Sequence, residues 1–184
     1  QSRCTSFFEN QIYDDLNWLG IKWNKAPLKQ SERLESYSKY LRKLANMGIL
    51  YACDCTRSDI KNALSAPNAQ PENLQPEIYP GLCKKKNLPP SGRNIRLNVL
   101  KTKEYLEEKA LSFVERGVGP NGDSGIQFFS IDWIYENYGD FIIARKDIRT
   151  SYHLSVTIDD ANQNITHISR GNDLFNVTPL HVLL

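Results

Sequence analysis

The sequence predicts an α/β fold, because segments with helical spacing of apolar residues are followed by short runs that alternate as strands do. Near the start, apolar side chains recur every three or four residues from Phe8 to Leu19, which is the period of an amphipathic helix. Near the end, residues 151–158 alternate apolar and polar side chains, the period of a half-buried strand. The 184 residues are 40% hydrophobic and 24% charged, which suits one globular domain with a buried core.

Two helices are expected in the first 48 residues. The first ends at Gly20, and a polar connector leads to a second helix that starts near Gln30. Gly48 is the natural end of the second helix. Its buried stripe consists of Leu34, Tyr37, Leu41 and Leu44. We expect the two helices to pair as an αα-hairpin.

A strand, a helix and a loop are expected next. Residues 49–52 predict a short strand, and Thr56 is placed to cap a helix that runs to about Leu64. Residues 65–77 are rich in Pro, Asn, Gln and Ala, so they predict a loop.

The region from residue 95 to residue 125 is less regular. Ile95, Leu97 and Val99 alternate as a strand does, whereas residues 105–114 fit either a helix or a helix followed by a strand. Residues 117–125 contain four glycines, but they lack the Lys-Ser/Thr pair of a phosphate-binding P-loop. A hairpin turn is the better interpretation of these glycines.

A polar turn then separates the strand predicted at residues 151–158 from a second one at residues 165–170. The turn residues are Asp159, Asp160, Asn162 and Asn164. Strand ends in α/β sheets commonly carry ligand-binding side chains.

Two side chains of this region are candidates for ligand binding. Arg170 can bind a carboxylate or phosphate through a charge-assisted contact worth about 1.5–3 kcal/mol, and the Tyr152 hydroxyl can reach the same ligand. The alternative is structural: Arg170 pairs with Asp173 or Asp160, and Tyr152 is a core aromatic with a solvated hydroxyl.

The cysteines are the candidate metal ligands in the sequence. Cys53, Cys55 and Cys83 can offer soft thiolates, which suit zinc, but a closed structural site needs a fourth ligand. The histidines are remote in sequence, at positions 153, 167 and 181. The alternative is three buried thiols in a reducing compartment, and Cys4 is expected to be a free thiol.

Net charge and hydropathy do not decide whether the protein binds a nucleic acid, but they argue against a membrane partner. A net charge of +2 and a pI of about 8.3 neither require nor exclude a nucleic acid. The basic cluster of Lys84, Lys85, Lys86, Arg93 and Arg96 fits a phosphate backbone or a solvated loop. No apolar run is long enough to cross a membrane, and the start lacks the apolar segment of a signal peptide, so we expect a cytoplasmic protein without membrane contact.

Six short blocks in the last third occur together, in order and at consistent spacing. They are GDFIIAR (139–145), YHL (152–154), DDA (159–161), ITH (165–167), RGNDL (170–174) and TP (178–179). With DDLNWLGIKW and QSERLESYSKYLRKL upstream, they resemble the glutamyl-tRNA synthetase superfamily of class I aminoacyl-tRNA synthetases. Within it, the chain is most similar to the short paralogue, glutamyl-queuosine tRNA(Asp) synthetase.

The resemblance implies a Rossmann-like class I catalytic domain interrupted by a small zinc-binding, acceptor-binding subdomain. The expected division is a helical hairpin at residues 1–48, the insertion with connecting strands at 49–138, and the second part of the catalytic domain at 139–184. The HIGH and KMSKS signatures, which hold ATP in the family, are expected before residue 1 and after residue 184. We therefore expect an internal fragment that cannot form the adenylate alone.

The resemblance also implies site residues. Arg170 matches the arginine that binds the glutamate side chain, and Tyr152 matches the tyrosine that closes over the amino acid; neither is a proton-transfer catalyst. The zinc motif of the short paralogue, C-x-C…Y-x-x-x-C, maps onto the expected ligands Cys53, Cys55, Tyr79 and Cys83. The gap between Cys55 and Tyr79 is longer than the family's usual gap.

The implied activity is ATP-dependent activation of glutamate, with magnesium, and its transfer by a monomeric enzyme to the queuosine base of tRNA(Asp). One alternative is an ordinary glutamyl-tRNA synthetase that charges tRNA(Glu). An alternative from another class is a non-catalytic, synthetase-like RNA-binding module.

Overall fold

The structure is a computed structural model that describes residues 5–64, 78–106 and 110–184. It divides the chain into two compact units, residues 1–32 and residues 33–184, which are described separately below. The loop predicted at residues 65–77 and the free thiol expected at Cys4 lie outside the described residues. The hairpin pairing of the first two helices and the three-part division of the chain stay predictions.

The first unit contains the predicted amphipathic helix, α1 (Ser6–Trp18). The hydroxyl of Thr5 accepts a hydrogen bond from the backbone N–H of Phe8 at 3.4 Å, which caps the helix. Gly20 has a φ of +74°, a conformation that glycine adopts without strain, so the helix ends where the sequence predicts.

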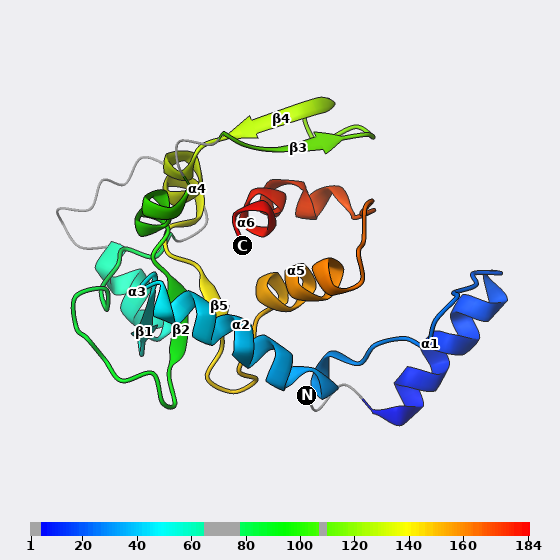
Figure 1. The fold of residues 1–184 in the computed structure, drawn as a ribbon, viewed down its shortest axis with the longest axis horizontal. Helices are drawn as coiled ribbons and strands as arrows, with labels where there is room; N and C mark the ends of the chain where they lie inside the picture. Colours follow the sequence, from blue (N-terminus) through cyan, green and yellow to red (C-terminus); the bar gives the residue numbers. More distant parts are fainter. Residues whose placement is uncertain (1–4, 65–77, 107–109) are drawn as a thin grey trace. The chain divides into compact units, whose positions relative to one another are not determined.

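The second unit mixes helices with strands along the chain, which confirms the predicted α/β class (Figure 1). The helices are α2 (Leu34–Asn46), α3 (Arg57–Leu64), α4 (Ile131–Tyr138), α5 (Tyr152–Asn162) and α6 (Thr178–Leu183). The strands are β1 (Leu50–Cys53), β2 (Asn94–Leu97), β3 (Leu111–Glu115), β4 (Gly125–Phe129) and β5 (Ile142–Ala144). Short 3₁₀ turns occupy Gln30–Glu32 in the first unit and Leu100–Tyr105 and Asn172–Val177 in the second.

The strands of the described residues form two antiparallel sheets. One has the order β1-β2-β5, with Tyr51 opposite Arg96, and the other is the β3–β4 hairpin, with Glu115 opposite Gly125. The strands predicted near residues 50 and 95 and the hairpin turn at residues 117–125 are therefore confirmed. No helix of the described part is both long enough and apolar enough to cross a membrane.

The largest core lies between the three-stranded sheet, α4 and α6. Its buried side chains are Ile49, Leu97, Val99, Ile131, Ile134, Phe141, Ile143 and Leu180. A second cluster packs α2 against α5 through Tyr37, Leu154 and Ile158. Beside this second cluster, the buried carboxylate of Asp159 accepts hydrogen bonds from Tyr37 at 2.7 Å and from Arg33 at 2.6 Å.

The strand predicted at residues 151–158 is wrong, because this segment forms α5. The buried residues Leu154 and Ile158 are four apart, a spacing that places them on one face of a helix as well as of a strand. The Ser151 hydroxyl accepts a hydrogen bond from the backbone N–H of Leu154 at 3.3 Å, which starts the helix. The residue after Ile158 in the same helix, Asp159, forms an ion pair with Arg33 at 2.6 Å.

The second predicted strand, at residues 165–170, is also wrong. The segment has no regular secondary structure, and Ile165 and Ile168 are about half exposed. Because the preceding segment is a helix, this one lacks the neighbouring strand that its β-branched residues would have paired with. The predicted turn is wrong for Asp159, Asp160 and Asn162, which belong to α5. Only Asn164, with a φ of +56°, lies in a turn after the helix.

Asp140 connects several elements of the second unit. Its side chain is 1% exposed and accepts hydrogen bonds from the Tyr51 hydroxyl at 2.8 Å and the Val99 backbone N–H at 2.9 Å. Nζ of Lys84 lies 3.0 Å from the same carboxylate. Its charge is thus matched by one cation and two further donors, as a buried carboxylate requires.

Replacing Asp140 by alanine leaves these donors without their acceptor inside the core. We expect Asp140→Ala to lower the free energy of unfolding by about 3–5 kcal/mol, the usual result of removing one partner of a buried ion pair. Urea denaturation followed by circular dichroism measures this change. The matched control is Asp132→Ala, which removes an exposed ion pair with Lys103 and should cost at most about 1 kcal/mol. Equal losses from the two variants would show that Asp140 has no special role.

Candidate functional site

Three cysteines and one tyrosine meet at the end of β1. The Sγ atoms of Cys53, Cys55 and Cys83 all lie within 4.8 Å of one another, and those of Cys55 and Cys83 are 3.3 Å apart. Oη of Tyr79 lies 3.4 Å from Sγ of Cys53 and 3.6 Å from Sγ of Cys55. All four residues that the sequence suggests as ligands are therefore neighbours in space.

The local fold explains how Cys55 is turned toward the cluster. The backbone N–H of Thr56 donates to the Asp59 carboxylate at 2.7 Å, and the Asp59 N–H donates to the Thr56 hydroxyl at 3.1 Å. This reciprocal cap starts α3 directly after Cys55, as the sequence predicts, and makes the chain leave the line of β1.

On the other side of the cluster, a close backbone contact holds Tyr79. Gly139 forms a parallel bridge with Tyr79 and has a φ of +59°. A Cβ atom at this position would lie 2.9 Å from Cγ2 of Ile78 and 3.1 Å from the carbonyl oxygen of Tyr79, so only glycine allows this approach. The backbone N–H of Cys83 donates to the Tyr79 hydroxyl at 2.8 Å, which ties the last cysteine to the ring.

A buried arginine lies on the tyrosine ring. The guanidinium carbon of Arg96 is 3.5 Å from the ring centroid of Tyr79, and Nη1 donates to the carbonyl oxygen of Asp140 at 2.7 Å. The positive charge sits on the face of the ring, where a cation–π contact is favourable. The sequence places Arg96 in a basic cluster that either binds a phosphate backbone or is solvated. The structure shows instead that Arg96 is only 5% exposed and makes its contacts inside the protein.

The protonation of these groups follows their surroundings. Burial raises the pKa of the Cys55 thiol to about 11, and it raises the pKa of the Tyr79 hydroxyl as well. Burial acts in the same direction on Cys53, but its contacts with Tyr79 and Arg96 outweigh it and lower the pKa of that thiol. Three soft sulfur donors converge here with a phenolic oxygen, a set that can hold a metal ion.

Tyr152 and Arg170 meet through a third residue, His181. Tyr152 is the first residue of α5 and is 47% exposed, and its ring centroid lies 5.6 Å from that of His181. Nη1 of Arg170 lies 2.5 Å from Nδ1 of His181, while Nη2 is 3.9 Å from the carboxylate of Asp160. The pairing of Arg170 with Asp160, one of the structural alternatives from the sequence, is thus present but long.

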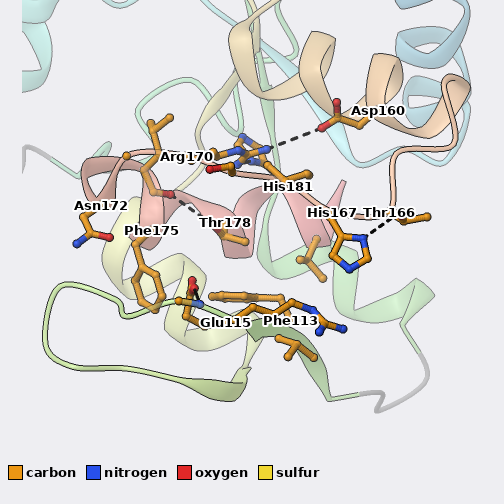
Figure 2. Close-up of a pocket in the computed structure, with 18 of the residues that line it drawn as sticks. Phe113, Glu115, Asp160, Thr166, His167, Arg170, Asn172, Phe175, Thr178 and His181 are labelled. Carbon is orange, nitrogen blue, oxygen red and sulfur yellow. Dashed lines mark hydrogen bonds and ion pairs between the residues drawn. The ribbon is translucent and has the colours of Figure 1, made fainter. Parts of the chain in front are cut away.

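Arg170 and His181 line a cavity of about 970 Å³ (Figure 2). Its walls come from β3, α5, the irregular segment before Arg170, the 3₁₀ turn after it, and α6. Figure 2 shows Arg170, His181 and Asp160 grouped on one side, with Phe113 and Glu115 of β3 across from them. Tyr152 contacts His181 without being part of the cavity wall.

Sequence reasoning missed the two histidines behind Arg170. Nε2 of His181 lies 3.0 Å from Nδ1 of His153, and both rings are partly buried. Burial, together with Arg170 and His153, lowers the pKa of His181 to about 4, and burial and Arg170 also lower the pKa of His153. The two histidines lie 28 positions apart, so no local motif joins them.

Comparisons with known proteins fit this arrangement. Residues 1–86 and 126–184 match the family described as tRNA synthetases class I (E and Q), catalytic domain. The chain is 39% identical over 186 residues to a glutamyl-Q tRNA(Asp) synthetase of Rhodobacter capsulatus, which covers all of this chain and 66% of that protein. It is 33% identical to a glutamate–tRNA ligase of a Hydrogenobaculum species, of which it covers 37%.

The chain thus spans about two thirds of the first of these relatives and little more than a third of the second. A solved glutamate–tRNA synthetase of Elizabethkingia anophelis superposes on the whole chain with a TM-score of 0.71 at 19% identity, and the chain covers 38% of it. At that identity the likeness concerns the fold alone, and it supports the predicted synthetase catalytic fold. Because the family match includes well over half of the residues, the chain belongs to the class I tRNA synthetase (E and Q) catalytic-domain family.

Proposed function

We propose that this chain is the glutamate-binding and metal-binding part of an enzyme that activates glutamate with ATP and transfers it to the queuosine base of tRNA(Asp). The observation that carries the proposal is the convergence of Cys53, Cys55, Tyr79 and Cys83 on one point. A tyrosine in such a cluster resembles the metal motif of the queuosine-modifying branch. The 39% identical relative bears the name of that branch.

In this proposal Arg170 binds the side-chain carboxylate of glutamate and Tyr152 covers the bound amino acid. The α-carboxylate then attacks the α-phosphorus of ATP and displaces pyrophosphate, and the acyl group passes from the adenylate to the RNA with release of AMP. Neither residue transfers a proton, because this chemistry depends on orientation and on charge stabilisation. Magnesium accompanies the ATP.

The proposed metal is one zinc ion, held by the three thiolates and the phenolate of Tyr79. Bound there, zinc would cross-link the end of β1 to the segment around Cys83 and stabilise both. Arg96 suits such a centre, because four anionic ligands exceed the charge of a divalent ion and the guanidinium on the ring reduces the excess.

A second candidate function is the charging of tRNA(Glu). It is favoured by the relatives named glutamate–tRNA ligase, which are 28–33% identical to the chain. A non-catalytic RNA-binding module is the third possibility, and the experiment below separates all three.

The deciding experiment uses the protein at its natural length with ATP, labelled glutamate and total tRNA, followed by nuclease cleavage of the labelled RNA. We expect the label in the anticodon fragment of tRNA(Asp). Label at the 3′ end of tRNA(Glu) would replace the proposal by the second candidate. A folded protein that labels no RNA would favour the non-catalytic module.

The metal proposal has its own test. Cys83→Ser should abolish stoichiometric zinc, whereas Tyr79→Phe, which keeps the three thiols, should weaken binding by about tenfold, the effect of losing one favourable contact. Elemental analysis and competition with a chromogenic chelator measure both. Affinity should rise with pH, since the metal displaces thiol protons and burial raises the pKa of Cys55 to about 11. Cys4→Ser is the control, and zinc retained by Cys83→Ser would contradict the ligand set.

The role of Arg170 is tested by Arg170→Gln. Removing a charge-assisted contact worth about 1.5–3 kcal/mol should raise the KM for glutamate by about 10- to 150-fold in ATP–pyrophosphate exchange. The KM for ATP should change little. Arg42→Gln, at an exposed position of α2, is the matched control. An unchanged KM for glutamate in Arg170→Gln would assign the arginine a structural role instead.

A further inference from the structure

Arg170 is held mainly by an uncharged partner. Its Nη1 lies 2.5 Å from Nδ1 of His181, a direct contact, whereas the Asp160 carboxylate is 3.9 Å away from Nη2, beyond hydrogen-bond distance. His181 in turn contacts His153, with 3.0 Å between Nε2 and Nδ1. A chain of three side chains therefore runs from the cavity wall inward to α5.

The positions of the ring protons of His181 and His153 follow by elimination. A guanidinium only donates, so Nδ1 of His181 must accept, and the proton of that ring is on Nε2. This Nε2–H points at Nδ1 of His153, which must accept, so the proton of His153 is also on Nε2. Both rings are neutral in this arrangement, because a second proton on either would place two donors face to face.

A neutral acceptor orients the guanidinium without cancelling its charge. A carboxylate in the place of His181 would fix Arg170 equally well, but it would neutralise the cation that an anionic ligand needs. The charged group in contact with His181 is Arg170, and Asp160 lies on the far side of Arg170. The neighbouring ring is that of His153. The lowered pKa values of both histidines agree with neutral rings at physiological pH.

We propose that His181, with His153 behind it, is the residue that positions Arg170 for the side-chain carboxylate of the amino-acid substrate. This inference rests on the proposed function. His181 also touches the ring of Tyr152, at 5.6 Å between centroids in an edge-on contact, so one imidazole contacts both predicted substrate-binding residues. Because its direct contact is neutral and its ion pair with Asp160 is long, at 3.9 Å, Arg170 keeps enough positive charge to favour a carboxylate over the neutral amide of glutamine.

The test compares three variants of the natural-length protein by glutamate titration calorimetry and by the KM for glutamate in ATP–pyrophosphate exchange. His181→Leu removes the acceptor, His181→Gln keeps an amide oxygen that can accept from Arg170, and Arg170→Gln is the benchmark. We expect His181→Leu to weaken glutamate binding about tenfold or more with kcat within about threefold. His181→Gln should restore binding to within about threefold of the wild type.

A spectroscopic measurement supports the kinetic one. In ¹⁵N NMR of the imidazoles at neutral pH, His181 and His153 should both show the Nε2–H tautomer, with the exposed His167 as the internal reference. Signals are assigned with single His→Gln variants. This readout uses the wild-type protein, so it holds even where His181→Leu fails to fold.

The outcomes separate this inference from the function on which it rests. Normal glutamate binding by Arg170→Gln would overturn the proposed role of Arg170 and the inference with it. Loss of binding in Arg170→Gln but not in His181→Leu would overturn the positioning role alone. Equal losses in His181→Leu and His181→Gln, or a proton on Nδ1 of His181, would also overturn it.

Discussion

The buried carboxylate of Asp140 is the constraint on which the second unit depends. It accepts from Tyr51 on β1 and from the backbone after β2, it pairs with Lys84 beside Cys83, and its own carbonyl oxygen holds Arg96. An unpaired carboxylate at this depth would be very unfavourable. The sheet and the segment that follows Cys83 must therefore both be folded in place to supply its partners. Because Arg96 lies on Tyr79, the same network fixes one member of the candidate metal centre.

The Asp140 network and the surroundings of Arg170 use charge in opposite ways. Around Asp140 the buried charge is matched by a lysine and by hydrogen-bond donors, which makes a closed structural network. At Arg170 the nearest partner is a neutral imidazole and the nearest carboxylate is 3.9 Å away, so much of the positive charge stays open to the cavity. The first arrangement suits a stable scaffold, and the second suits an anionic ligand.

The same sequence that suggested the candidate site residues led to a wrong secondary structure around two of them, Tyr152 and Arg170. Alternation over residues 151–158 predicted a strand, yet the buried pair Leu154 and Ile158 fits a helix equally well. The choice was made by distant partners: Tyr37 and Arg33 bind Asp159, which lies on the buried face only if the segment is helical. Local periodicity contains no information about those partners.

The sequence by itself determined the α/β class and the ends of several elements, because these follow from local spacing and from residue chemistry. Its resemblance to a known family indicated the family and suggested Tyr79 beside the three cysteines. Gly20 and Gly48 end helices and Thr56 caps one, and each does so through residues close to it in sequence. Only the tertiary structure decided that Arg96 is buried on Tyr79 and that His153, Arg170 and His181 form one chain of contacts. Those contacts join residues far apart in sequence, and packing determines which of the many possible pairs meet.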